Sequence, residues 1–217
     1  MTLATITQSG LAQNIQDNGD KVLISLVVKP DEKPLLVEVW GKNAKDSAKT
    51  LEGKGIVVTG ELYAINNSYT ITTADVKEHP YSPDQAISAI SLVGRIGRDI
   101  DAQYFASGNN VAKSSIAVNG YKDREKTVSW FNWEAWNKTG ERAGNFLSKG
   151  VMVGFLGSLN QESYTKKGSG EIVQLHKVRV SEIYLMPKSM SDGNQASSNK
   201  QYAATAKTSS GDDGVAF

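Results

Sequence analysis

The sequence contains no cysteine, only two histidines and no arginine among its first 80 residues. The absence of cysteine excludes disulfides and thiolate chemistry, and it fits a reducing compartment. Neither His79 nor His176 stands at a metal-ligand spacing, so we expect no zinc site and no cofactor. No nucleophile–base pair and no Walker-type phosphate loop is visible, and we therefore expect a protein that is not an enzyme.

Long hydrophobic runs are also missing. No stretch of about 18 apolar residues occurs, so no membrane span is predicted. The N-terminus MTLATITQSG lacks the basic and apolar regions of a signal peptide, and we expect a cytoplasmic protein. A hydrophobic fraction of 39% and a charged fraction of 22% are typical of a soluble globular protein, and 217 residues suit one or two domains.

The net charge of +1 conceals an uneven distribution of charge along the chain. Residues 1–80 carry 8 lysines against 10 acidic residues, whereas residues 81–187 carry 13 Lys and Arg against 10 acidic residues. All the arginines lie in this middle segment. Local charge steers charged ligands even where the average is near zero, so the middle segment is the more favourable one for a polyanion.

The chain also repeats itself. The segment VEVWGKNAKDSAKTLEGKGIVVTGEL at residues 37–62 is similar to WEAWNKTGERAGNFLSKGVMVGFLGSL at residues 133–159, with Trp40 aligned to Trp136. Each copy is flanked by β-branched runs typical of strands and contains one short helical pattern.

The helical pattern of the second copy is the clearer of the two. Ala143, Phe146 and Leu147 stand at the spacing of one helix face, and we expect the helix to end at Gly150. About five strands with one helix between the third and fourth predict a small closed Greek-key barrel, the OB-fold.

The predicted fold class is therefore all-β with one short helix per unit, in two tandem OB-fold barrels. We expect a first barrel over residues 1–80, a linker at 81–86 and a second barrel over 87–187. Residues 188–217 are rich in Ser, Gly, Asn and Ala, and we expect a disordered tail because such a segment buries too little apolar surface to offset its ordering entropy. From the residues alone, this tail is either bare or ends in a peptide motif, GDDGVAF.

Three of the four tryptophans stand within the stretch VSWFNWEAWNK. Side chains of a strand alternate between two faces, and here one face is wholly apolar, made by Phe131, Trp133 and Ala135. The other face combines Trp130 and Trp136 with Asn132 and Glu134, which a dry core would not accept without cost. We expect Trp133 in the core, whereas Trp130 and Trp136 are either core residues or an exposed stacking platform.

Exposed aromatic rings beside Lys and Arg are how proteins bind single-stranded nucleic acid, since stacking contributes about 1–3 kcal/mol per base. Tyr121 in NGYKDREK and Tyr164 in SYTKKGSGE fit this use. The alternative for each tyrosine is a surface ring at the edge of a loop.

Residues 88–187 resemble the bacterial single-stranded DNA-binding protein family. The matching runs are SLVGRIGRDIDAQYFASGNNVAKSSIAVNGYKD, TVSWFNWEAWNK and AGNFLSKGVMVGFLGSLNQESYTKKG. The resemblance implies binding of single-stranded DNA without sequence specificity, in replication, repair and recombination. It implies base stacking on Tyr121, Trp130, Trp136 and Tyr164, with Trp133 on the core side. We expect backbone steering from Arg95, Lys122, Arg124, Lys138, Lys166 and Lys167.

The end of the chain resembles the same family. Members often end in an acidic tip followed by Ile-Pro-Phe, which docks genome-maintenance proteins. The tip here, residues 211–217, keeps two acids, an aliphatic residue and the final Phe carboxylate in Asp212, Asp213, Gly214, Val215, Ala216 and Phe217. A third acid and the proline are absent. The resemblance implies recruitment of genome-maintenance proteins through this tip, a nucleoid-associated location and a homo-oligomer, either dimer or tetramer.

The first barrel departs further from the family. It keeps Trp40 and offers Tyr63 and Tyr69, but Pro34 stands near the position that matches Trp130. This barrel is either a second DNA-binding unit or a degenerate one kept for assembly. Two other functions stay open for the whole chain, namely a scaffold of a replication or primosome assembly with only weak DNA binding, and an RNA-binding protein.

Overall fold

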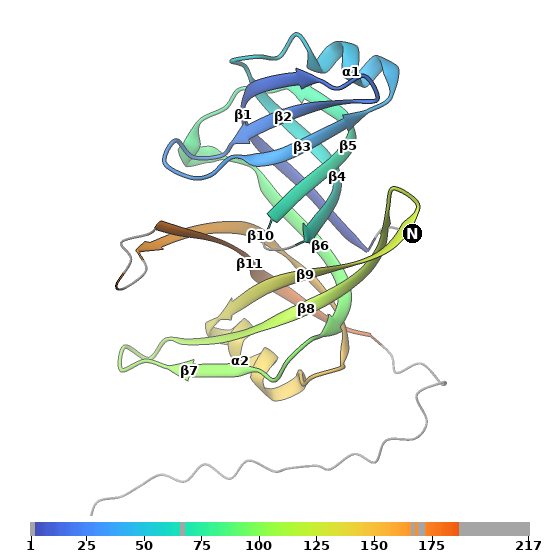
Figure 1. Cartoon of the computed structure of the whole chain (residues 1–217). Helices are drawn as coiled ribbons and strands as arrows, with labels where there is room; N and C mark the ends of the chain where they lie inside the picture. The colour runs from blue at the N-terminus through green and yellow to red at the C-terminus, as the bar shows by residue number, and fades with distance from the viewer. Residues whose placement is uncertain (1–2, 66–67, 166–167, 169–171, 187–217) are drawn as a thin grey trace, which may run out of the picture. The chain divides into compact units, whose positions relative to one another are not determined.

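The structure is a computed structural model, and it describes residues 3–65, 68–165, 168 and 172–186 (Figure 1). The first half comprises β1 (Ala4–Asp17), β2 (Lys21–Val27), β3 (Leu35–Trp40), α1 (Lys42–Ala48), β4 (Gly55–Ile65) and β5 (Ser68–Glu78). After the 3-10 helix η1 (Pro83–Gln85), the second half comprises β6 (Ser88–Ile96), β7 (Asp101–Tyr104), β8 (Asn110–Lys122), β9 (Glu125–Trp136), α2 (Asn137–Phe146), β10 (Met152–Thr165) and β11 (Ile172–Leu185).

Each half closes into a five-stranded barrel. In the first, β1 pairs with β2, β2 with β3, β3 with β5, β5 with β4 and β4 with β1. In the second, β6 pairs with β8, β8 with β9, β9 with β11, β11 with β10 and β10 with β6. The β3–β5 and β9–β11 pairs are parallel and the others antiparallel. A closed barrel with its helix between the third and fourth strands is the OB-fold, and the predicted fold class is confirmed.

The internal repeat is visible as matching positions in the two barrels. Trp40 and Trp136 are each the last residue of the third barrel strand, directly before the helical segment. The register shifts beside Gly60 on β4 and at Gly157 on β10. A Cβ at Gly60 would lie 2.3 Å from the carbonyl oxygen of Thr72, and one at Gly157 would lie 2.2 Å from that of Arg179. Glycine is therefore required at both bulges because the neighbouring strand approaches too closely for a side chain.

Alternating side chains build the two cores. Along β2, Val22, Ile24 and Leu26 are fully buried and alternate with partly exposed neighbours, as expected for a strand with one face inward. In the second barrel the rings of Trp133 and Phe155 meet edge to face, with centroids 5.0 Å apart. Burial of each large apolar side chain contributes about 1.5–3 kcal/mol, so these rings are principal stabilisers of the second core.

The two barrels are joined through their first strands. β1 pairs antiparallel with β6, with Ile6 opposite Ile90, so one continuous sheet runs from one barrel into the other (Figure 1). The ring of Tyr69 packs on Phe131 and His176 of the second barrel, at centroid distances of 5.7 and 4.7 Å. Its hydroxyl donates to the carbonyl oxygen of His176 at 3.3 Å. The barrels lie in one compact unit, held by backbone pairing and by this buried aromatic contact.

The structure corrects two expectations for the second barrel. Helix α2 ends at Phe146 and not at Gly150, because Leu147 already has extended backbone angles. Leu147 is buried from that extended position, whereas Phe146 is 60% exposed, so Ala143, Phe146 and Leu147 do not share one helix face as predicted. The second barrel also has an additional strand, β7, paired with β8, for which the repeat gave no signal because the first barrel lacks a counterpart among its described residues.

The predicted tail over residues 188–217, including the tip at 211–217, lies outside the described residues. Within the part of the chain that is described, neither helix is long and apolar enough to cross a membrane.

We expect the stability of the protein to depend on the protonation of His176. This side chain is only 8% exposed, and burial, together with the nearby charge of Lys33, lowers its pKa to about 4. Histidine in an unfolded chain titrates near 6.5, so the unfolded state binds the proton more tightly. The free energy of unfolding should therefore fall as pH falls from about 7 to about 4, by at most roughly 3 kcal/mol.

Urea denaturation of the wild type and of His176→Gln at pH 7, 5.5 and 4 measures this contribution. Carboxylates titrate in both proteins, so the difference between the two curves isolates the histidine. The expectation is that the variant loses less stability on acidification. Parallel pH curves would show that His176 titrates alike in the folded and unfolded states.

Candidate nucleic-acid interface

Strand β9 divides its tryptophans between the two faces of the second barrel. Trp133 is 1% exposed and lies in the core, as predicted, whereas Trp130 is 54% exposed. The indole of Trp130 lies over Gly97, where a Cβ would come within 2.3 Å of the ring. Gly97 belongs to the GRIGRD turn, and sequence reasoning did not assign it a role. Only a residue without a side chain leaves this seat free for the indole.

Three of the four predicted stacking residues share the outer face of the β8–β9 pair. Opposite residues in an antiparallel pair point to the same side, and here Ala117 faces Trp130 while Tyr121 faces Lys126. The alternation therefore places Tyr121 with Trp130 and Trp136. Tyr121 is 62% exposed and Trp136 is half-buried. Tyr164 belongs to β10, and its side chain lies outside the described residues, as do Lys166 and Lys167.

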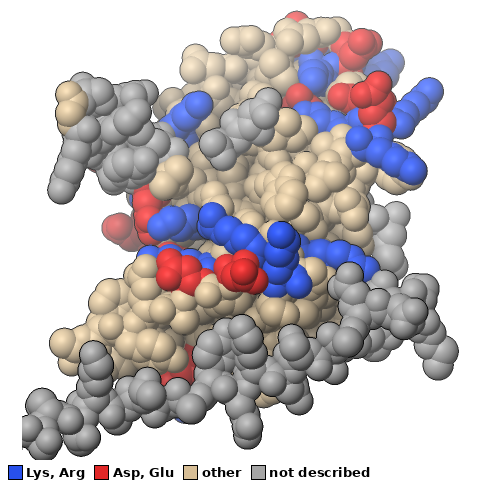
Figure 2. Space-filling view, turned by 60° about the horizontal axis from the view of Figure 1, so that its bottom comes forward, with Lys and Arg blue, Asp and Glu red and all other residues tan. Residues whose placement is uncertain are grey.

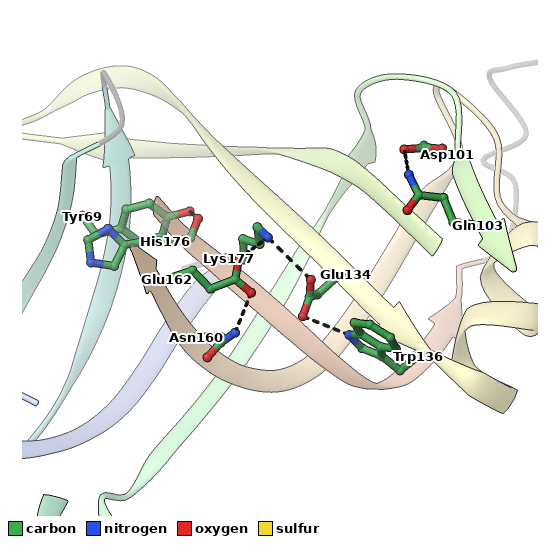
Figure 3. A network of polar contacts seen from close by, with 9 residues as sticks. All are labelled: Tyr69, Asp101, Gln103, Glu134, Trp136, Asn160, Glu162, His176 and Lys177. Carbon is green, nitrogen blue, oxygen red and sulfur yellow. Dashed lines mark hydrogen bonds and ion pairs between the residues drawn. The ribbon is translucent and has the colours of Figure 1, made fainter. Parts of the chain in front are cut away.

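Trp136 is held by a chain of polar contacts (Figure 3). Its indole N–H donates to Glu134 Oε1 at 3.0 Å, and Lys177 Nζ lies 3.7 Å from Glu134 Oε2. Lys177 also pairs with Glu162, which accepts a hydrogen bond from Asn160 Nδ2 at 3.2 Å. Glu134 is only 3% exposed despite its place on the outer face. A buried carboxylate needs such partners, and this one fixes the plane of the indole in return.

Two further side chains touch the Trp136 ring. Phe105 lies nearly parallel to it, with centroids 6.0 Å apart and planes 12° apart, and the guanidinium of Arg179 lies 6.0 Å from its centroid. Phe105 is 44% exposed, and its neighbour Tyr104 is 75% exposed. Sequence reasoning missed all three. The available signal was the aromatic pair in QYFASG before a turn, together with an arginine on the outer side of β11.

The predicted steering residues differ in their surroundings. Lys122 Nζ lies 3.6 Å from Glu38 Oε2 and 5.5 Å from the ring centroid of Tyr63, so it is bound to the first barrel. Arg124 is exposed in the turn between β8 and β9. Arg95 is exposed and donates to the carbonyl of Gly150 at 3.1 Å. Lys138 is exposed in the first turn of α2.

One face of the molecule carries a band of positive charge. Figure 2 shows Lys and Arg side chains gathered in a band across one face, with a smaller group of Asp and Glu side chains beside it. Elsewhere in the described residues, no group of three or more His, Asp or Glu side chains could hold a metal ion.

The aromatic candidates of the first barrel have other surroundings. Tyr63 and Tyr69 are 7% and 5% exposed, and burial raises the pKa of both hydroxyls above its ordinary value. The Tyr63 hydroxyl donates to the carbonyl oxygen of Tyr121 at 2.7 Å. Neither tyrosine presents a free ring face to solvent, because both are committed to the second barrel. Trp40 is half-buried, with Lys21 Nζ 5.3 Å from its ring centroid.

These features define a class of protein: paired OB-fold barrels whose second barrel carries exposed rings on one strand pair. The model of the single-strand binding protein family matches residues 87–186. Single-stranded DNA-binding protein 1 of Synechocystis sp. is 37% identical over 102 residues, which are 46% of this chain and 84% of that protein. The protein of the same name from Nostoc sp. is 37% identical over 101 residues, with the same coverage. The chain belongs to the single-strand binding protein family.

Solved structures extend the likeness of fold to the first barrel. The wild-type single-stranded DNA binding protein from Thermus aquaticus superposes with a TM-score of 0.62 and covers 90% of this chain and 97% of its own, at 17% identity. A deletion mutant of that protein has a TM-score of 0.63 and covers 87% of this chain and 96% of its own, at 16% identity. At such identities the likeness concerns the fold, and it includes both barrels.

We expect Glu134→Ala to destabilise the second barrel although it removes a buried charge. The indole N–H of Trp136 would lose its acceptor and Lys177 one of its two carboxylates, at a cost of about 1–3 kcal/mol. Glu134→Gln keeps an acceptor oxygen and should cost less. Urea denaturation measures the change, and the indole N–H resonance of Trp136 reports the hydrogen bond directly.

Glu125→Ala, at an exposed position on the same strand, is the matched control and should change stability by less than about 0.5 kcal/mol. Equal stability of Glu134→Ala and this control would mean that the carboxylate does not hold the indole.

Proposed function

We propose that this protein binds single-stranded DNA without sequence specificity, through the outer face of the β8–β9 pair. The observation that carries the proposal is the exposure of Tyr121 and Trp130 on the same face as Trp136. Aromatic rings left in water on a barrel surface cost free energy, and stacking on bases recovers it at about 1–3 kcal/mol per base. The names of the relatives from Synechocystis and Nostoc support the same function.

In this proposal the phosphates meet a second set of residues. Arg95, Arg124 and Lys138 are exposed on the second barrel, and Lys166 and Lys167 follow Tyr164 in the sequence. Each phosphate contact releases counterions, so the affinity should fall as salt rises. Lys122 has a different role, because its contact with Glu38 holds the β8–β9 turn, and with it Tyr121, against the first barrel.

We propose that the first barrel supports the DNA-binding face of the second barrel and contributes less to DNA binding itself. Tyr63 and Tyr69 are buried in the contact with the second barrel, and no arginine occurs in residues 1–80. The bonds from Tyr63 to Tyr121 and from the amide of Ala64 to Ser129 Oγ, at 3.2 Å, brace the strands that carry the exposed rings.

Replacing Trp130 tests the stacking face. We expect Trp130→Ala to weaken binding of a dT oligomer of about 35 nucleotides by roughly 5- to 150-fold, the range that corresponds to one lost base stack. The matched variant Trp40→Phe, on the first barrel, should leave the affinity unchanged. Titrations followed by fluorescence anisotropy, with the wild type as reference, measure both.

The same titrations separate the competing functions. The proposal is contradicted if the wild type binds duplex DNA as tightly as it binds the dT oligomer. Equal or tighter binding to an rU oligomer would replace it with RNA binding. A dissociation constant in the non-specific range of about 10⁻⁴–10⁻⁶ M would favour a scaffold with only incidental DNA binding.

We further propose that residues 211–217 recruit genome-maintenance proteins. Two adjacent acids and a terminal Phe carboxylate offer both charge and an apolar ring, which a basic pocket with an apolar floor would bind together. The predicted dimer or tetramer stays a prediction.

Deletion of residues 211–217 should abolish binding to a purified protein that recognises the acidic tips of family members, while the affinity for the dT oligomer stays within about twofold. Deletion of residues 191–197, an equally long piece of the same tail, is the control and should preserve both. Surface plasmon resonance measures the protein contact. Retention of that contact by the first deletion would place recruitment elsewhere.

A further inference from the structure

A groove lies between the first turns of α2 and the end of β11, with a volume of about 570 Å³. Its lining includes Lys138, Thr139, Arg142, Ser181, Glu182 and Tyr184. The Thr139 hydroxyl donates to the carbonyl oxygen of Ser181 at 3.3 Å, which ties the helix to the strand along the floor. Tyr184 is 47% exposed, so its ring is available at the side of the groove.

A bulge in β11 forms part of the lining of this groove. Glu182 pairs with Leu156 and Val180 with Gly157, so Ser181 is an extra residue without a partner in β10. Its hydroxyl donates back to the carbonyl oxygen of Leu156 at 3.1 Å, and both Ser181 and Glu182 are exposed. Such bulges re-aim side chains at the rims of barrels, and here Ser181 and Glu182 both line the groove.

Both elements that line the groove are connected to the surroundings of Trp136. Lys138 and Thr139 follow Trp136 by two and three residues, at the start of α2. On β11, the guanidinium of Arg179 lies 6.0 Å from the Trp136 ring centroid, and Arg179 stands two residues before Ser181. These two connections are the route that a strand stacked on Trp136 would follow to the groove.

The chemistry of the groove suits a nucleotide. Lys138 and Arg142 are four residues apart on α2 and exposed, so their charges lie on the same side of the helix. The one acid in the lining, Glu182, accepts a hydrogen bond from the Tyr184 hydroxyl. That bond raises the pKa of Tyr184, and the charge of Arg142, which also lines the groove, acts in the opposite direction. Two cations beside an exposed aromatic ring are the elements of a single-strand binding surface.

We infer that the α2–β11 groove is a further nucleotide-binding subsite, in which Tyr184 stacks on a base and Lys138 and Arg142 bind phosphates. It extends the path of single-stranded DNA beyond Trp136, around the end of the second barrel. The inference rests on the proposed function. Oligomers of different length test the two separately, because only a strand that continues past Trp136 enters the groove.

The test uses the full chain and compares dT oligomers of about 8 and about 35 nucleotides, since one OB-fold covers about 4–16 nucleotides. Tyr184→Ala combined with Arg142→Ala should weaken binding of the long oligomer by at least about 5-fold, the change expected for one lost base stack. The affinity for the short oligomer should stay within about twofold. The salt dependence of long-oligomer binding should also fall, by about 0.7 in the slope of log K against log salt for the lost phosphate contact.

Phe146→Ala combined with Lys149→Ala is the matched control. It removes an exposed aromatic ring and a cation near the other end of α2, away from the groove lining, and should change neither affinity. Arg142→Gln alone keeps the tyrosine and should lower the salt slope, so the inference stays testable if the double variant does not fold.

Unchanged binding of the long oligomer and an unchanged salt slope would overturn the inference, and the groove would then be free for a protein partner. Equal losses on both oligomers would also overturn it, because the groove would not extend the path. Failure of the wild type to bind either oligomer would instead contradict the proposed function.

Discussion

Closure of the second barrel is the constraint on which its surface depends. β9 is paired on both sides, with β8 and with β11, so its register cannot slip and each side chain has a fixed face. Trp133 fills the interior against Phe155, and this forces Trp130 and Trp136 outward. A shift of one residue would bury two indoles with a carboxylate and expose Trp133, which explains why a single strand can present rings to water and still be stable.

Support for that face comes from two sides. On the outer face itself, the chain of contacts from Asn160 through Glu162, Lys177 and Glu134 ends at the Trp136 indole. From the first barrel, Tyr63 bonds to the backbone beside the exposed Tyr121 ring. The Trp136 ring is therefore oriented in the free protein, and such preorganisation reduces the ordering cost of binding a ligand. The first barrel contributes through this brace and through the β1–β6 pairing.

Sequence patterns were a good guide to the fold and a partial guide to the site. The repeat and its strand spacing led to two OB-fold barrels, and alternation along β9 put Trp133 in the core, and both predictions are confirmed. The same alternation left Trp130 open between core and surface, and the structure exposes it. The predicted end of helix α2 at Gly150 was wrong, because the prediction relied on glycine as a stop signal and the backbone already becomes extended at Leu147. Phe105 was overlooked because its partner, Trp136, lies 31 residues further along the chain and no local pattern links them.

What the sequence determined by itself is the set of local features: the strands, the alternation of their faces and the burial of Trp133. These follow from a period of two residues, which needs only neighbouring positions. Tertiary structure decided which polar and aromatic side chains are exposed and which contact other parts of the protein. The sequence offers Tyr69 as a candidate stacking ring, yet its hydroxyl donates a hydrogen bond to the carbonyl oxygen of His176, 107 positions away. Lys122 stays a predicted phosphate-steering residue, and the tertiary structure adds an ion pair 3.6 Å long from its Nζ to Glu38 Oε2 of the first barrel. The α2–β11 groove likewise exists only because a helix and a distant strand meet, and such contacts carry no periodic signal.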